Sequence, residues 1–361
     1  MLSVRARMHR LFQESKADVI LIANTKSADS NFLYMTGFTS GLFEGAYLII
    51  TPKKEILITN PLEYLIAKKE RPREMQVVNA TGRKQVLSIF KQYMKNKTVG
   101  INGNFLPYNA YKRLKELTGA KKFVDISDGF TKAREVKDHD EIAKITKAVR
   151  IIKKVLNDIE EYFSYGISEK DIADKVEELM KSYGADGPSF PTIVCFGANA
   201  AIPHHMPDNT RLKPNSFVLI DCGARYKNYC SDITRTFIFE PYMTSQKYKR
   251  MSEMISTVRR AQKKALESMR PGVRGKVPHN TAAETIDKAA GGRYKGKFIH
   301  SLGHSIGIEV HDSGTGFYPS EEGKLKENMI ISDEPGIYIE GFGGVRIEDD
   351  VIITKRGAKM L

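Results

Sequence analysis

Between residues 139 and 354 the sequence repeats one order of elements, and this repetition constrains the fold more than any other feature. Apolar residues three and four positions apart first predict a long amphipathic helix. They are Ile142, Ile145, Val149, Ile152, Leu156, Ile159 and Phe163. A second helix is predicted to start after Ser168, with Asp171 three residues on, and to end near Gly184, before strand-like segments. A long helix over about 245–269, a shorter one over about 280–290 and strand-like segments over 298–354 repeat the order. We infer an α+β domain of two similar halves that close on a shared site.

The residues before this repeat alternate strands and helices, which is typical of a small α/β domain. We expect strands at 17–23, at 98–101, at 121–126 and twice within 46–59, helices at 85–94 and 108–117, and one more helix before the first strand. Polar residues at 127–138 predict the boundary. We therefore assign residues 1–130 to the first domain and residues 131–361 to the second.

Positive charge is concentrated in the first domain. The chain has a formal net charge of +14, and its first 136 residues carry 23 of the 57 Lys and Arg but 12 of the 43 Asp and Glu. The excess is scattered in pairs such as Lys53–Lys54 and Lys68–Lys69, without the signature of a nucleic-acid-binding module. We expect a solvated basic surface and no nucleic-acid partner.

Other sequence features favour a cytoplasmic protein. The start MLSVRARMHRLF lacks the apolar segment of a secretory signal, and no apolar run approaches the roughly 18 residues of a membrane span. The cysteines Cys195, Cys222 and Cys230 are an odd number without C-x-x-C spacing. We expect buried, reduced thiols.

The stretch GHSIG at 303–307 matches the G-x-S-x-G pattern of serine hydrolases. That motif needs a helix after the serine, and the acid and histidine of the triad further along the chain. The segment that follows Ser305 is IGIEVHD, which alternates like a strand. His311 is the one histidine after Ser305, with Glu309 as the acid between them. Because these residues are too close in sequence to form an independent triad, we reject the serine nucleophile.

Carboxylates in apolar segments favour a metal site instead. Asp221 and Asp232 lie eleven residues apart across two strand-like segments, and Glu334 and Glu348 each interrupt an apolar stretch. An unpaired carboxylate in such surroundings is costly. Four carboxylates with one or more histidines form a plausible metal cage; oxygen ligands suit Mg, Mn and Ca, and imidazole adds Zn, Co and Fe.

Five motifs carry a resemblance to a known family. They are P-H-H at 203–205, D-x-G at 221–223 with T-R at 234–235, G-H-x-x-G-x-x-x-H at 303–311, E-P-G-x-Y at 334–338 and R-x-E-D at 346–349. Together they resemble the dinuclear metallopeptidases of the pita-bread fold, in particular the branch of aminopeptidase P and prolidase. The resemblance covers nearly the whole chain. It implies an α/β creatinase-like N-terminal domain and an α+β pita-bread catalytic domain with pseudo-twofold halves.

The resemblance also implies a ligand set. Two divalent metal ions (Mn, Co or Zn) would be held by Asp221, Asp232, His304, Glu334 and Glu348. Asp232 and Glu348 would bridge the two ions, Asp221 would complete one, and His304 and Glu334 would complete the other.

Further residues match the family's substrate site. His204 and His311 would line it and, together with Glu334, be the catalytic residues, while Arg346 and Tyr338 would support the ligands.

Three positions near these motifs have no ligand role in the pattern. His205 and His300 are read as structural or substrate-facing, and Ser305 stands where many relatives have glycine.

The activity implied is a metallo-exopeptidase that hydrolyses the Xaa-Pro bond of peptides with proline at the second position. Dipeptides and longer peptides both remain open, with a slight preference for longer ones. A homodimer is expected, with the Gly-rich loop 34–47 as the segment that reaches a neighbour's cleft. The alternatives are an inactive pita-bread domain that binds protein or RNA and, less favoured, a metal-free amidinohydrolase.

Overall fold

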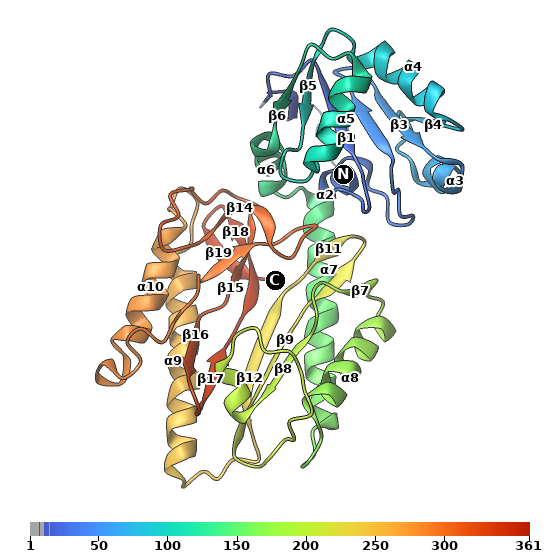
Figure 1. Ribbon diagram of the computed structural model, residues 1–361. Helices are drawn as coiled ribbons and strands as arrows, with labels where there is room; N and C mark the ends of the chain where they lie inside the picture. The colour runs from blue at the N-terminus through green and yellow to red at the C-terminus, as the bar shows by residue number, and fades with distance from the viewer. Residues whose placement is uncertain (1–6, 8–10, 14) are drawn as a thin grey trace. The chain divides into compact units, whose positions relative to one another are not determined.

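The computed structural model describes residue 7, residues 11–13 and residues 15–361 (Figure 1). The chain forms two compact units that divide between Arg134 and Glu135. The helix expected before the first strand falls largely outside the described residues. Within the described part of the chain, none of the helices combines the length and the apolar character that a bilayer crossing requires.

The first unit is built on a six-stranded mixed sheet in the order β4-β3-β2-β1-β5-β6. Its strands are β1 (Val19–Ala23), β2 (Tyr47–Ile50), β3 (Glu55–Thr59), β4 (Gln76–Asn79), β5 (Thr98–Ile101) and β6 (Lys122–Asp125). Its helices are α2 (Ser30–Thr36), α3 (Pro61–Glu70), α4 (Arg83–Met94), α5 (Tyr108–Thr118) and α6 (Ser127–Glu135). The β3–β4 and β5–β6 pairs are parallel, and α3 and α5 provide their crossovers.

The predicted strands and the two predicted helices of this unit are confirmed. The sheet is central because β1 has the sequence VILIA, with every residue buried, and pairs with β2 on one side and β5 on the other. The segment 127–138, where the sequence predicted the boundary, contains a helix that was not predicted. Ser127–Glu135 is the helix α6, which buries Phe130 and Ala133.

The second unit repeats the order helix, helix, strands, as predicted (Figure 1). Its first half contains α7 (His139–Asp158), η1 (Ile159–Tyr162), α8 (Glu169–Ser182), β7 (Gly187–Pro188), β8 (Ile193–Phe196), η2 (Gly197–Ala201), β9 (Ser216–Cys222), β10 (Ala224–Tyr226), β11 (Tyr229–Cys230) and β12 (Ile233–Phe239). Its second half contains α9 (Gln246–Ser268), α10 (Lys276–Asp287), η3 (Ala289–Gly292), β13 (Gly303–Ser305), β14 (Asp312–Phe317), β15 (Ile330–Asp333), β16 (Gly336–Ile339), β17 (Gly343–Arg346), β18 (Asp349–Thr354) and β19 (Gly357–Met360).

Local sequence signals fix the helix starts of the first half. Asp138 and Glu141 form a capping box at α7, and Ser168 and Asp171 form one at α8, where the sequence predicted a cap. Each box satisfies backbone N–H groups that the first turn leaves without helical partners.

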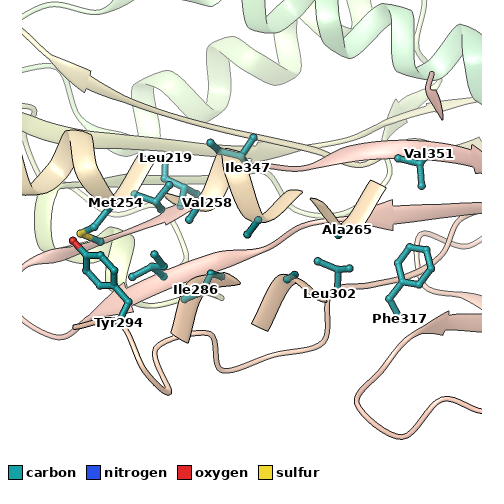
Figure 2. Close-up of a cluster of buried hydrophobic side chains, with 14 of the residues drawn as sticks. Leu219, Met254, Val258, Ala265, Ile286, Tyr294, Leu302, Phe317, Ile347 and Val351 are labelled. Carbon is teal, nitrogen blue, oxygen red and sulfur yellow. The ribbon is translucent and has the colours of Figure 1, made fainter. Parts of the chain in front are cut away.

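The strands of the second unit lie between the helix pairs α7–α8 and α9–α10 (Figure 1). On the α9–α10 side a continuous apolar cluster joins helices to strands, with Met254 and Val258 of α9 beside Leu219 of β9 and Ile286 of α10 (Figure 2). This core holds the strand ends that carry the polar residues described next.

The segment after Ser305 differs from expectation. Residues 306–311 form a bent loop between β13 and β14, where the sequence pattern had suggested a strand. Ile306, Gly307 and Ile308 are all buried, so the apolar residues of this segment pack in a buried loop. As expected, no helix follows Ser305.

Candidate metal centre

A cavity of about 690 Å³ in the second unit collects the residues that the motifs singled out. Its polar lining consists of His204, Asp221, Asp232, His300, Ser301, His304, His311, Glu334, Arg346 and Glu348. Its other lining residues are Phe190, Ile193, Ile202, Pro203, Ile299 and Tyr318. All five predicted ligands and both predicted substrate histidines therefore face one space.

Strand ends from both halves place the acidic residues. Asp221 is near the end of β9 and Asp232 directly precedes β12, and the β9–β12 pairing sets Thr234 opposite Asp221. Glu334 follows β15, and its backbone N–H donates to Leu302 O at 2.8 Å. Glu348 lies between β17 and β18 and donates its N–H to Thr234 O at 3.1 Å.

Two motif glycines allow the strands to approach this closely. A Cβ on Gly223 would lie 1.9 Å from Ser231 O, and a Cβ on Gly303 would lie 1.9 Å from Ser332 O. Both distances are far below van der Waals contact, so a side chain at either position would separate strands that carry ligands.

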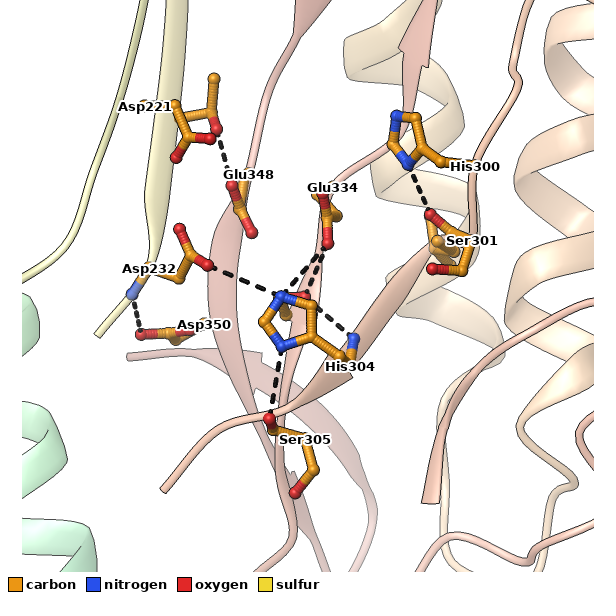
Figure 3. Close-up of polar contacts among 12 residues, drawn as sticks. Asp221, Asp232, His300, Ser301, His304, Ser305, Glu334, Glu348 and Asp350 are labelled. Atoms are coloured by element: carbon orange, nitrogen blue, oxygen red, sulfur yellow. Dashed lines mark hydrogen bonds and ion pairs between the residues drawn. The ribbon is translucent and has the colours of Figure 1, made fainter. Parts of the chain in front are cut away.

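His304 is the centre of the acidic cluster (Figure 3). Its Nε2 lies 3.6 Å from Asp232 Oδ2 and 3.5 Å from Glu334 Oε1. Single ligand atoms of Asp232, His304 and Glu348 all lie within 4.8 Å of one another. His304 Nδ1 is 3.3 Å from Ser305 O, and this contact leaves Nε2 to face the acids.

The electrostatics of the cluster fit cations. Burial, reinforced by the charges of neighbouring acids, raises the pKa of Asp232 and of Glu348 well above their usual values. Burial also raises the pKa of Glu334 to about 8, and burial together with His311 lowers the pKa of His304 to about 4. Two carboxylates 4 Å apart repel by about 4 kcal/mol at an effective dielectric of 20.

Buried carboxylate oxygens without hydrogen-bond partners are a second reason to expect a cation here. Asp221 Oδ1, Asp232 Oδ1 and Glu348 Oε1 are buried and have no hydrogen-bond partner among the described residues. Orphaned buried acceptors are costly unless they bind a proton or a cation. Neutral imidazole is the metal-binding form of histidine. The donor set therefore fits divalent metal.

Arg346 organises the side of the cavity next to Asp221. Its Nη2 donates to Asp221 Oδ2 at 2.6 Å, its Nη1 to Tyr338 Oη at 3.0 Å and its Nε to Thr234 Oγ1 at 3.1 Å. The guanidinium is buried, and each of its three nitrogens donates a hydrogen bond to a protein oxygen. Burial raises the pKa of Tyr338 to about 12, so its hydroxyl remains a neutral partner.

Several supporting contacts were not predicted from the sequence, although Thr234 lies in the T-R motif at 234–235. Thr234 Oγ1 donates to Glu348 Oε2 at 2.6 Å, and Asp350 Oδ2 accepts from the backbone N–H of Asp232 at 3.0 Å (Figure 3). Gln262 of α9 donates to Asp333 O at 3.1 Å. Such partners orient ligands, and only the pairing of distant strands brings them here.

Of the other histidines in and near the motifs, three line the cavity and one, His205, does not. His204 and His311 are exposed at the cavity, and the His311 ring centroid lies 4.1 Å from that of His304. His300 also lines the cavity and contacts Tyr338 Oη at 2.8 Å. His205 instead points to Glu169, with its Nε2 2.8 Å from Glu169 Oε2.

The hydroxyl of Ser305 is occupied elsewhere. Its Oγ accepts a hydrogen bond from Lys137 Nζ at 3.1 Å, and that buried ammonium is 3.9 Å from Asp312 Oδ2. Ser305 thus follows the predicted ligand His304, and its hydroxyl is bonded to Lys137, which is not a member of a Ser-His-acid triad.

Comparison with known proteins identifies the class. The family model "Metallopeptidase family M24" matches residues 143–355, and "Creatinase/Prolidase N-terminal domain" matches residues 5–136. The fold and the carboxylate–histidine cavity are thus those of a metallopeptidase with a creatinase-type N-terminal domain. The chain belongs to metallopeptidase family M24.

Individual relatives extend over the full length. The chain is 37% identical over 359 residues to the Xaa-Pro dipeptidase of Pyrococcus furiosus. This match covers 98% of this chain and 96% of that dipeptidase. Among solved structures, the Xaa-Pro dipeptidase of Bacillus anthracis has a TM-score of 0.89 at 30% identity, covering 99% and 97% of the two chains. The X-Pro aminopeptidase of Thermotoga maritima has a TM-score of 0.87 at 32% identity, covering 97% of each. The creatinase-like domain and the pita-bread domain with two similar halves are therefore confirmed.

Proposed function

We propose that this chain is a metal-dependent exopeptidase that hydrolyses the Xaa-Pro bond at the N-terminus of peptides. The observation that carries the proposal is the convergence of four carboxylates and His304 on one cavity, with buried oxygens that lack protein partners. The printed names of the relatives supply the bond class. The inactive binding module gains no support, because every proposed ligand position carries a ligand-type side chain.

In this proposal Asp221, Asp232, His304, Glu334 and Glu348 hold two divalent ions, Mn, Co or Zn. Such ions, when bound, supply Lewis-acid polarisation of a carbonyl and a water of lowered pKa. Arg346 fixes Asp221, with support from Tyr338, and Thr234 fixes Glu348, so both carboxylates are oriented before substrate arrives.

The catalytic residues act at the open side of the cavity. His204 and His311 donate hydrogen bonds to the substrate carbonyl oxygen as negative charge develops on it. Glu334 accepts the proton that the attacking water gives up and returns it to the proline nitrogen as the C–N bond breaks. Its Oε1 accepts a hydrogen bond from Ser332 Oγ at 3.1 Å. The apolar lining, including Ile299 and Tyr318, fits the proline ring.

Charge at the cavity favours peptides longer than two residues. A dipeptide presents its terminal carboxylate inside the site, and a bidentate arginine is the best partner for it. Of the described residues that line the cavity, Arg346 alone has a guanidinium or ammonium group, and its nitrogens are already bonded to the protein. Lys326, which lies between His311 and Glu334 in the sequence, bonds to Glu135.

The decisive experiment supplies Mn, Co or Zn to metal-stripped protein and compares an Xaa-Pro dipeptide with an Xaa-Pro-Yaa tripeptide. We expect hydrolysis of both, with kcat/KM for the tripeptide at least equal. A kcat/KM about a hundredfold higher for the dipeptide, about 2.7 kcal/mol, would contradict the preference for longer peptides. No hydrolysis of either with any metal would contradict the function.

Three wider features complete the proposal. Residues 131–361 catalyse the reaction, and residues 1–130 shape access in a homodimer. A cytoplasmic location agrees with three buried cysteines that form no disulfide. Sedimentation of the metal-loaded protein tests the dimer.

A further inference from the structure

The cavity wall that carries His204 is a segment with little packing of its own. Residues 202–209 contain no helix or strand, yet they and η2 bring Ile202, Pro203 and His204 to the cavity. Ile202 is 54% exposed and Met206 is 61% exposed. Apolar burial therefore does little to fix the position of His204.

A single buried carboxylate holds this segment. Glu169, the first residue of α8, has a fully buried side chain. Its Oε1 accepts from Phe196 N at 2.6 Å and Asn199 Nδ2 at 3.0 Å. Its Oε2 accepts from His205 Nε2 at 2.8 Å and Asp208 N at 3.1 Å. The four donors span the segment on both sides of His204.

The backbone reinforces the same attachment. Glu169 N donates to Thr210 O at 3.2 Å, and Lys170 N donates to Asp208 O at 3.2 Å. The carboxylate also lies at the N-terminus of α8, where the helix dipole favours negative charge. Since a carboxylate is acceptor-only, His205 must carry its proton on Nε2.

The spacing of Glu169, His205 and Asp208 would also suit a metal ion. Four N–H donors already fill the roughly four acceptor positions of the Glu169 carboxylate. The hydrogens of these N–H groups would point at a cation bound beside the Glu169 carboxylate and would repel it. The contacts therefore favour a structural anchor.

We propose that Glu169 is a positioning residue for peptide hydrolysis, acting through His204. Its carboxylate fixes residues 196–208 so that His204 faces the substrate, and the His205 side chain is one of the four hydrogen-bond donors to it. This inference rests on the proposed function, because that function places His204 at the substrate.

The substitution Glu169→Gln tests this with little change of shape. An amide nitrogen replaces one acceptor oxygen, so two of the four donors face another donor. Asn199→Ala removes one hydrogen-bond donor to Glu169 and keeps the carboxylate. It is the milder variant, to be used if Glu169→Gln folds poorly. Glu178→Gln is the matched control, since Glu178 lies on the same helix with its side chain 68% exposed.

Hydrogen exchange measures the anchoring without any activity. In Glu169→Gln, peptides covering 196–208 should exchange roughly tenfold faster or more, and peptides from α9 should not change. Asn199→Ala should shift the same peptides less, and Glu178→Gln should not shift them. Unchanged exchange in both Glu169→Gln and Asn199→Ala would overturn the anchor, as would acceleration spread evenly over the unit. Protection of 196–208 by Mn or Zn that disappears in Glu169→Gln would show a metal site and overturn it too.

Kinetics then test the link to His204. Glu169→Gln should lower kcat roughly 10- to 100-fold, the order expected for misplacement of a reacting group, with KM and bound metal nearly unchanged. In a His204→Ala background the same change should lower kcat less than about threefold, because coupled residues are non-additive. Equal losses in both backgrounds would overturn action through His204. If the wild type hydrolyses no Xaa-Pro peptide while the exchange results hold, the proposed function fails and the anchor stands.

Discussion

The substitution Glu334→Gln should remove the contribution of one carboxyl group to the pH dependence of stability of the metal-stripped protein. Glu334 has its pKa raised by burial to about 8 in the folded chain, against an ordinary value of 4.5. A carboxyl group with a raised folded pKa stabilises the fold below its unfolded pKa. This contribution is lost as pH rises through the folded pKa. Glutamine imitates the protonated carboxyl and does not titrate.

The magnitude follows from proton linkage. Between the two pKa values the unfolded chain releases a proton that the folded chain keeps, which costs about 1.4 kcal/mol per pH unit. Allowing for partial titration at both ends, Glu334 accounts for a loss of about 3 kcal/mol between pH 5 and pH 8. His300 and His304, whose pKa values burial lowers to about 4, act in the opposite direction below pH 6.5. The contribution of His300 is common to both proteins and cancels in the comparison, whereas His304 Nε2 lies 3.5 Å from Glu334 Oε1 and any change in its titration is part of the measured difference.

Urea unfolding of both stripped proteins at pH 5, 6.5 and 8 measures this effect. The stability of wild type minus that of Glu334→Gln should fall by about 3 kcal/mol across the series. A difference that stays constant within about 0.5 kcal/mol, or that rises with pH, would refute the assignment of Glu334 as a buried carboxyl held near other acids. Exposed Glu340→Gln is the control and should leave the wild-type pH dependence unchanged.

Three further predictions test neighbouring residues. Asp232→Ala should abolish both bound metal, counted by elemental analysis, and activity; two ions per chain with near-normal turnover would contradict the ligand assignment. His311→Ala should lower kcat by roughly 10²–10⁴ with metal retained, and loss of an ion would show that its role and that of His304 are exchanged. Ser305→Ala removes one of several partners of Lys137 Nζ, so we expect a stability loss of about 1 kcal/mol and less than about a tenfold change in kcat; complete inactivity together with chelator resistance would revive a serine nucleophile.

The sequence was sufficient for the order of elements because periodic burial decides it. The helix α7 follows its apolar spacing, and α8 starts at the predicted capping residue Ser168. The helix α6 was missed because several of its buried residues are polar, such as Ser127, Arg134 and Glu135, and therefore give no apolar periodicity. The loop after Ser305 was misread because the apolar residues Ile306 and Ile308 alternate in the sequence, although the loop is buried continuously from Ile306 to Ile308.

The ligand motifs were visible because a buried acid in an apolar segment needs a reason. Arg346 and Tyr338 were expected to support the ligands, whereas the roles of Thr234 and Glu169 were not predicted, since a threonine or a glutamate is ordinary anywhere on the surface. Thr234 meets Glu348 across 114 residues, and His205 meets Glu169 across 36. A glutamate in the first turn of a helix also has a sufficient local explanation in the helix dipole. Only the tertiary fold shows a second role.

The links around the centre explain why the catalytic unit is built from two halves. Asp221 and Asp232 come from the first half, whereas the other proposed ligands come from the second. Arg346 of the second half donates to Asp221 of the first, and Thr234 of the first donates to Glu348 of the second. Neither half alone supplies the hydrogen-bond partners of Asp221 and Glu348. Without metal, the carboxylates of the two halves repel one another where the halves meet. Metal binding should therefore contribute to the cohesion of the halves as well as to chemistry, because it replaces that repulsion with ligands shared between them.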